Sequence, residues 1–260
     1  MSPFQKLARW LAHKNRHKSY QQIVRQRTIL LLPLFILILA LLVSDFWQPT
    51  FWLSALLLLV LFWGINSTYQ ASFSYMLLDD VNIAVYQAYL DSSKLIQALN
   101  KNSKFIFEMA QVDLDYIQGN FQQADHRLAK LALPKKLSKR TEGFVWNAYK
   151  FRLLLDMQLG RQVDLEQSLA QMSQLAIANE ELLLGIRAAC DLLFVTVAND
   201  FYTDKKSDYY LHQLQYDYYS ALNAELRGQR EKAYQLSQKL ATANPQLYLV
   251  RQAQEKLKAM

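Results

Sequence analysis

The stretch TILLLPLFILILALLVSDFWQPTFWLSALLLLVLFWG, residues 28–64, decides the fold because it is almost entirely apolar and contains a single charged residue, Asp45. No charge occurs in the seventeen residues of 28–44 or in the thirty-one residues of 48–78. A helix needs about 20 apolar residues to cross the hydrocarbon core of a bilayer, with a lower limit of about 17. We therefore predict a transmembrane hairpin of two helices over residues 28–78.

The break between the two runs, VSDFWQPT at residues 43–50, is typical of a turn at a membrane surface. Asp45 favours water, and the proline that follows it can end one helix and start the next. Trp47 and Trp52 are expected to anchor the hairpin at the headgroup boundary, where indole rings accumulate. Pro33 is expected in the first turns of the first helix, where a missing backbone N–H is tolerated.

Two other interpretations of the apolar stretch are weaker. A cleaved signal peptide has a short basic region and a cleavage site between small residues, and neither is evident here. A buried hairpin of a soluble protein keeps a polar face, whereas leucine occupies every face of these two runs. Both comparisons favour the membrane hairpin.

The charge of the chain is concentrated in its first 27 residues, which hold seven lysines and arginines and no acid. The other 22 basic residues equal the 22 acidic ones in number, so the pI near 9.3 does not indicate a nucleic-acid-binding domain. Basic flanks stay in the cytoplasm, and two spans return the chain to the side on which it started. We predict a bacterial inner-membrane protein with both termini cytoplasmic.

Residues 1–27 allow two interpretations. Phe4, Leu7, Ala8 and Leu11 have helical spacing beside basic residues, which predicts an interfacial helix on the anionic inner leaflet. The alternative is a disordered positive flank that only sets the topology of the hairpin.

The part of the chain after residue 78 is expected to be helical, because glycine and proline are sparse and strand-like alternation is rare. Helix, glycine, polar turn and helix recur around Gly119, Gly160 and Gly228, which are separated by 41 and 68 residues, the second being twice 34. A tight turn between two short helices requires a residue that adopts a positive φ. We therefore predict three helical hairpins that turn at these glycines.

The last of these units resembles the tetratricopeptide repeat (TPR), a 34-residue helix-turn-helix. Ala221, Gly228, Ala233 and Pro245 fall at the spacing of that family's small helix-A residue, turn glycine, helix-B alanine and closing proline. The first unit matches at Gly119, Ala124 and Pro134, with its proline two residues early, and the middle unit matches only at its glycine, with Leu165 where the family has alanine. The resemblance implies an all-α chain in which residues 79–260 form a cytoplasmic TPR-like α-solenoid.

The resemblance also implies a concave groove that holds a protein or peptide partner. By register, the groove residues are Tyr218, Tyr219 and Leu222 in the last unit and Asn147, Lys150 and Leu154 in the middle unit.

Six of the fifteen tyrosines lie between residues 202 and 219, on two adjacent helical stripes that a single amphipathic face cannot bury completely. One stripe contains Tyr210, Leu214 and Tyr218, and the other contains Tyr209, Tyr216 and Tyr219. The alternative to a binding groove is that the first stripe is buried in the core and the second covers a groove between helices.

No motif of catalysis, phosphate binding or metal binding occurs, and the four histidines are scattered along the chain. The single cysteine, Cys190, lies in an apolar run and is expected to be a buried, inert thiol. We expect no cofactor and no enzymatic activity. The sequence favours a membrane-anchored adaptor that binds a protein or peptide. The alternative is an accessory subunit of a membrane transport or envelope-assembly complex, in which the hairpin packs against other spans.

Overall fold

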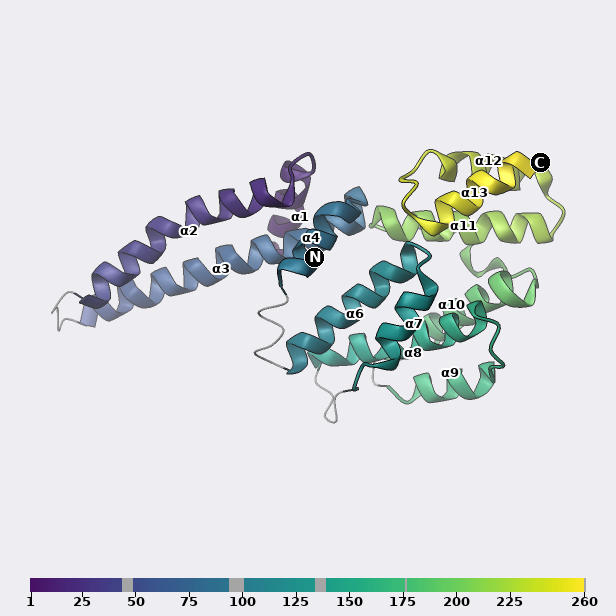
Figure 1. The fold of residues 1–260 in the computed structure, drawn as a ribbon, viewed down its shortest axis with the longest axis horizontal. Coiled ribbons are helices and arrows are strands. Elements are labelled where there is room, and N and C mark those ends of the chain that lie inside the picture. The colour runs from purple at the N-terminus through teal and green to yellow at the C-terminus, as the bar shows by residue number, and fades with distance from the viewer. Residues whose placement is uncertain (44–48, 94–100, 134–138, 176, 260) are drawn as a thin grey trace. The chain divides into compact units, whose positions relative to one another are not determined.

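The computed structural model describes residues 1–43, 49–93, 101–133, 139–175 and 177–259, and every element in these ranges is helical (Figure 1). The chain divides into two compact units, residues 1–89 and residues 90–260. The first unit contains the apolar helices, and the second contains the glycine-turn hairpins. The predicted boundary between residues 78 and 79 lies eleven residues before this division, because a further short helix, α4 (Ile83–Ser92), begins within the first unit.

The first unit contains two long apolar helices, α2 (Tyr20–Val43) and α3 (Pro49–Asp80), which pack against each other. Both are long and apolar enough to cross a membrane, over Tyr20–Leu41 and Trp52–Asp80, with mean hydropathies of 1.9 and 1.5. Only 17% of the most apolar window of each helix is buried, whereas the core helix of a soluble protein is mostly buried. Large apolar side chains such as Ile36, Leu57 and Trp63 are therefore exposed.

The position of Pro33 in this hairpin differs from the expected one. The expectation that Pro33 lies in the first turns of its helix is wrong, because α2 begins at Tyr20 and Pro33 lies in the helix interior. The basic segment before residue 28 continues the helix instead of preceding it. The tip with Trp47 lies outside the described residues, whereas Trp52 is described and its side chain is 61% exposed.

An N-terminal helix, α1 (Pro3–Asn15), packs on α3 within the same unit. It begins with a capping box, in which Ser2 Oγ accepts a hydrogen bond from the Gln5 N–H and Gln5 Oε1 accepts one from the Ser2 N–H. Ala8 and Ala12 are fully buried, and small side chains at these positions allow the two helices to approach closely. Residues 3–15 are therefore an ordered helix in the structure.

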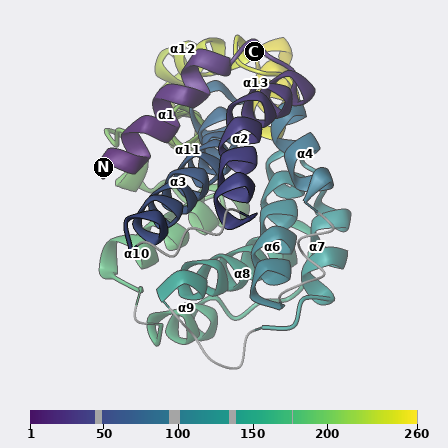
Figure 2. The same cartoon turned by 90° about the vertical axis from the view of Figure 1, so that its left-hand side faces the viewer.

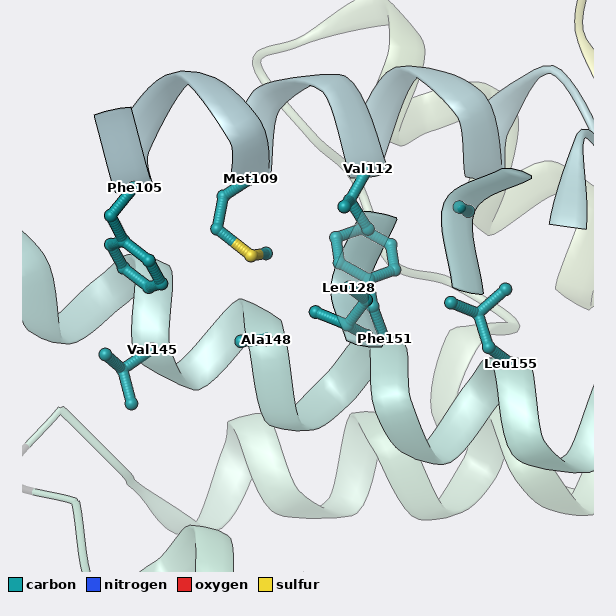
Figure 3. Packing of buried hydrophobic residues seen from close by; sticks show 9 residues of the cluster. Phe105, Met109, Val112, Leu128, Val145, Ala148, Phe151 and Leu155 are labelled. Carbon is teal, nitrogen blue, oxygen red and sulfur yellow. The ribbon is translucent and has the colours of Figure 1, made fainter. Parts of the chain in front are cut away.

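The second unit begins with a helical hairpin, α6 (Lys101–Ile117) and α7 (Phe121–Ala129), which packs on α8 (Lys139–Gln158). Helix α8 is followed by α9 (Leu165–Ser173) and α10 (Glu180–Cys190). Figure 3 shows the core between α6, α7 and α8, where side chains at helical spacing interdigitate. The residues of this core are Phe105, Met109, Val112, Ala124, Leu128, Val145, Ala148, Phe151 and Leu155.

The chain leaves α10 through a π-helical turn, η1 (Asp191–Val195), which ends at Thr196 with a φ of 56°. A short 3₁₀ turn, η2 (Asp200–Tyr202), follows it. The remaining helices are α11 (Tyr210–Leu226), α12 (Arg230–Ala241) and α13 (Tyr248–Ala259). Each helix of this unit contacts its neighbours in the chain.

The three predicted turn glycines all adopt a positive φ, of 78° at Gly119 and 71° at both Gly160 and Gly228. Each lies between two helices of one hairpin, so the prediction of three glycine-turn hairpins is confirmed. The predicted helix-B alanines Ala124 and Ala233 are buried at the helix-helix contacts.

One contact departs from the neighbour-only packing of a solenoid, in which each repeat touches the next. The last helix, α13, returns to the turn of the first hairpin. Arg251 Nη2 donates a hydrogen bond of 2.6 Å to the backbone carbonyl of Gln118, and the rings of Phe121 and Tyr248 lie 4.9 Å apart, edge to face. The second unit is therefore closed by a contact between its first and last elements.

Candidate functional site

A cleft of about 670 Å³ lies between α8, α10, η2 and α11 in the second unit. This volume is within the usual range of ligand sites, about 300–1,000 Å³. Helix α8 contributes Phe144, Trp146, Asn147 and Lys150 to its wall. The other lining residues are Gly143, Ile177, Glu181, Leu182, Gly185, Ile186, Phe201, Tyr202, Lys205, His212, Gln215 and Tyr216. Aromatic rings and a few polar or ionisable groups therefore face one hollow.

Tyr202 fixes the wall between α10 and α11. Its hydroxyl donates a hydrogen bond of 2.7 Å to the carbonyl of Gly185, and its own carbonyl accepts one of 2.9 Å from Ser220 Oγ. A Cβ at Gly185 would approach Phe201 Cε1 to 3.0 Å, so the absence of a side chain at this position allows the ring of Phe201 to pack closely on α10. The aromatic segment is held tightly against both helices.

Lys150 is the polar group of the cleft with the most unusual environment. Burial lowers its pKa, and the negative charge of Asp113, on α6, opposes that shift. Burial likewise raises the pKa of Asp113, opposed by Lys150. Among the described residues Lys150 makes no ion pair within 4 Å, although its Nζ lies 4.5 Å from the ring centroid of Phe151. A partly buried ammonium without a direct carboxylate partner is suited to binding an anionic group.

The other ionisable groups of the cleft are already paired or shifted toward neutrality. Lys205 forms an ion pair with Glu181 and lies 4.0 Å above the ring of Phe201. Burial, and then the charge of Lys150, lower the pKa of His212. Lys150 is therefore the group in the cleft best placed to meet a carboxylate of a ligand.

The structure brings only two of the six predicted groove residues, Asn147 and Lys150, to the cleft. Tyr218 and Leu154 are 8% and 5% exposed and belong to the interior. Tyr219 and Leu222 pack on the buried cluster that contains Tyr202, and the rings of Tyr219 and Tyr202 are 4.6 Å apart. Tyr219 and Leu222 therefore support the wall of the cleft from behind, and Leu154 shares a buried cluster with the lining residues Trp146 and Ile186.

The burial of the two tyrosine stripes differs in part from the expected pattern of a core stripe and a covering stripe. Leu214 and Tyr218 of the first stripe are buried, but Tyr210 is 46% exposed because it lies at the first turn of α11. Tyr216 of the second stripe lines the cleft, as the covering role implied. Sequence reasoning missed Trp146, Phe201 and His212, whose only signal was their aromatic or ionisable character.

Cys190 is fully buried, and burial raises the pKa of its thiol to about 12, which confirms the prediction of a buried thiol. Among the described residues no group of three or more histidine, cysteine, aspartate or glutamate side chains is arranged to hold a metal ion.

Comparisons of the chain with models of protein families, with curated proteins and with solved structures find no match. The TPR-like interpretation therefore rests on the residue spacing given above and stays a prediction.

Proposed function

We propose that the chain is a bacterial membrane-anchored adaptor whose second unit binds a protein or peptide segment in the cleft between α8, α10 and α11. The observation that carries this proposal is the combination of Lys150, which has no direct carboxylate partner within the part of the chain that the structure describes, with a wall of aromatic side chains. Aromatic rings bind apolar side chains at low entropic cost, and a desolvated ammonium favours a carboxylate. The preferred ligand is a segment that presents an acidic group beside a large apolar side chain.

The anchor in this proposal is the α2–α3 hairpin, inserted so that both termini are in the cytoplasm. The length, hydropathy and exposure of the two helices support insertion, and the acid-free basic flank of residues 1–27 supports this orientation. The hairpin would hold the cleft near the inner face of the membrane, where it restricts the search of a partner to that surface.

The orientation can be tested by cysteine labelling, because Cys190 is buried and should give no background with a membrane-impermeant maleimide. Glu231→Cys, on an exposed position of α12, is expected to react in inverted membrane vesicles and not in right-side-out vesicles. Asp45→Cys, in the segment between the two spans and outside the described residues, is expected to show the opposite pattern. Labelling of Glu231→Cys from outside the cell would contradict the proposed orientation.

Partner binding can be tested by placing a photo-crosslinking residue, p-benzoylphenylalanine, at Tyr216 of the full chain in cells. We expect a specific adduct from this position, which lines the cleft, and none from the same residue placed at Tyr234 on α12, which does not. The amount of adduct should fall with the double variant Asp113→Asn/Lys150→Met. This variant removes both charges together, so neither buried charge is left without the opposite charge.

A charged hydrogen bond contributes about 1.5–3 kcal/mol, so the double variant should lower affinity for an acidic partner segment about tenfold or more. Lys232→Met, at an exposed position of α12, is the matched control and should leave affinity unchanged. Equal adducts from positions 216 and 234, or equal affinity of the double variant and the wild type, would contradict binding in the cleft.

A further inference from the structure

The α1 helix carries an exposed apolar stripe that packing within the first unit does not cover. Phe4, Leu7 and Trp10 are 42%, 52% and 55% exposed. Their spacing of three residues places them along one side of the helix, while the buried Ala8 and Ala12 face α3. Large side chains are thus on the open side of α1, and small ones are at the protein contact.

An ion pair fixes the orientation of this stripe relative to the apolar hairpin. Arg9 Nε and Nη2 donate hydrogen bonds of 2.7 Å and 2.9 Å to the two carboxylate oxygens of Asp79, at the end of α3. A bidentate pair of this kind restrains both distance and rotation. Helix α1 packs on α3, and Figure 2 shows it as a separate helix that does not continue α3. The stripe therefore projects from a helix clamped beside the end of α3.

The charges around the stripe favour an anionic surface. Lys6 and Lys14 are exposed on α1, and Lys14 Nζ lies 4.9 Å from the ring centroid of Trp10. Asp79 neutralises Arg9, but no acid lies within residues 1–27 to balance the other six basic residues. The same charge disfavours a second copy of this face as the occupant, because the two cationic surfaces would repel each other.

We infer that α1 lies on the surface of an anionic phospholipid bilayer, with Phe4, Leu7 and Trp10 in the headgroup boundary. Lys6 and Lys14 then contact the lipid headgroups. Tryptophan and large apolar residues on one side of a helix with lysines beside them are typical of interfacial helices. The inference rests on the proposed two-span anchor, since the packing of α1 on α3 brings α1 to the membrane. It adds a second membrane contact that sets the tilt of the first unit against the bilayer.

The sequence-based prediction of an interfacial helix included Ala8 together with Phe4, Leu7 and Leu11. The predicted placement of Ala8 is wrong, because Ala8 is completely buried on α3. Trp10, which that prediction did not include, takes its place on the exposed side.

The test uses the full chain in nanodiscs made from phosphatidylcholine, with or without phosphatidylglycerol. An environment-sensitive fluorophore is attached at Leu7→Cys, in the stripe, or at the control position Gln5→Cys, which is exposed and lies nearly opposite Leu7 around α1. We expect a blue shift and quenching by lipids spin-labelled near the headgroup at position 7, stronger with phosphatidylglycerol. Position 5 should stay aqueous in both lipids. Phe4→Cys provides a second stripe position if the label at residue 7 disturbs packing.

Several outcomes would overturn the inference. An aqueous signal at positions 4 and 7 in both lipids means that α1 is not on the bilayer. Equal quenching at positions 7 and 5 means that the stripe has no preferred orientation toward the bilayer, and equal quenching with and without phosphatidylglycerol means that the charge of α1 plays no role. Resistance of the chain to alkaline carbonate extraction tests the two-span anchor separately, and crosslinking at Tyr216 tests partner binding in the cleft. A wrong inference about α1 is therefore distinguishable from a wrong proposal about the anchor or the cleft.

Discussion

Replacing Gly119 with valine is expected to lower the free energy of unfolding of the second unit by about 2–5 kcal/mol. Two effects combine at this position. A β-branched residue is strained at a φ of 78°, and a Cβ would lie 2.7 Å from Tyr248 Cδ2 and 3.1 Å from Tyr248 Cβ. Tyr248 is held by Phe121 and by the packing of α13, so it cannot move aside without opening the contact that closes the unit. A typical domain has only about 5–15 kcal/mol of stability, so the loss should be large.

Gly228→Val is the matched control, because Gly228 has a φ of 71° but no atom within 4 Å of an added Cβ. It should show the backbone strain alone, about 1–2 kcal/mol. Urea unfolding of the full chain in nanodiscs, followed by circular dichroism, gives the two free energies, and hydrogen exchange of residues 248–259 reports on α13. If the two variants lose equal stability and α13 exchanges normally in both, α13 does not pack on the first hairpin.

The helical hairpins of the second unit were predictable because their signals are local. A glycine between two helical patterns specifies the turn, and the structure places positive φ values at all three glycines. The apolar helices were predictable for the same reason, since length and continuity of hydrophobicity are properties of a single segment. The extension of α2 back to Tyr20 was not predicted, because charged residues do not stop a helix that already has a stable continuation.

The cleft could not be predicted, because its residues come from segments far apart in the chain and its shape depends on how those segments pack. Asn147 and Lys150 were found from the helix register of the resembled repeat. The same register assigned Tyr218 to the groove, but that ring is buried because α11 packs against both α12 and the η2 segment. Periodicity identifies the faces of a helix without saying which neighbour covers each one.

The Asp79 carboxylate illustrates the same limit. Asp79 lies at the end of α3, directly before a second acidic residue, Asp80. In the structure Asp79 binds Arg9, seventy residues earlier in the chain. A partner so distant in sequence leaves no periodic or local signal, so only the packing of α1 on α3 shows it.

The η2 segment depends on Asn223, which is 4% exposed on α11. Asn223 Oδ1 accepts a hydrogen bond of 2.9 Å from the Asn199 N–H. Its Nδ2 donates to Asp200 Oδ1 at 2.8 Å and to Thr203 Oγ1 at 3.2 Å. One buried amide thus supplies both an acceptor and a donor to the loop that carries Phe201, Tyr202 and Lys205 into the cleft.

Asn223→Leu, which keeps the volume and removes these bonds, is expected to reduce the free energy of unfolding by about 2–4 kcal/mol, because a buried polar group without a partner costs about 1–3 kcal/mol. Gln235→Leu, at an exposed position of α12, should change it by less than about 0.5 kcal/mol. Faster hydrogen exchange of residues 196–205 should accompany the loss, together with a weaker crosslink from position 216. A variant that unfolds like the wild type and keeps slow exchange in this segment would show that Tyr202 and Ser220 alone hold the wall of the cleft.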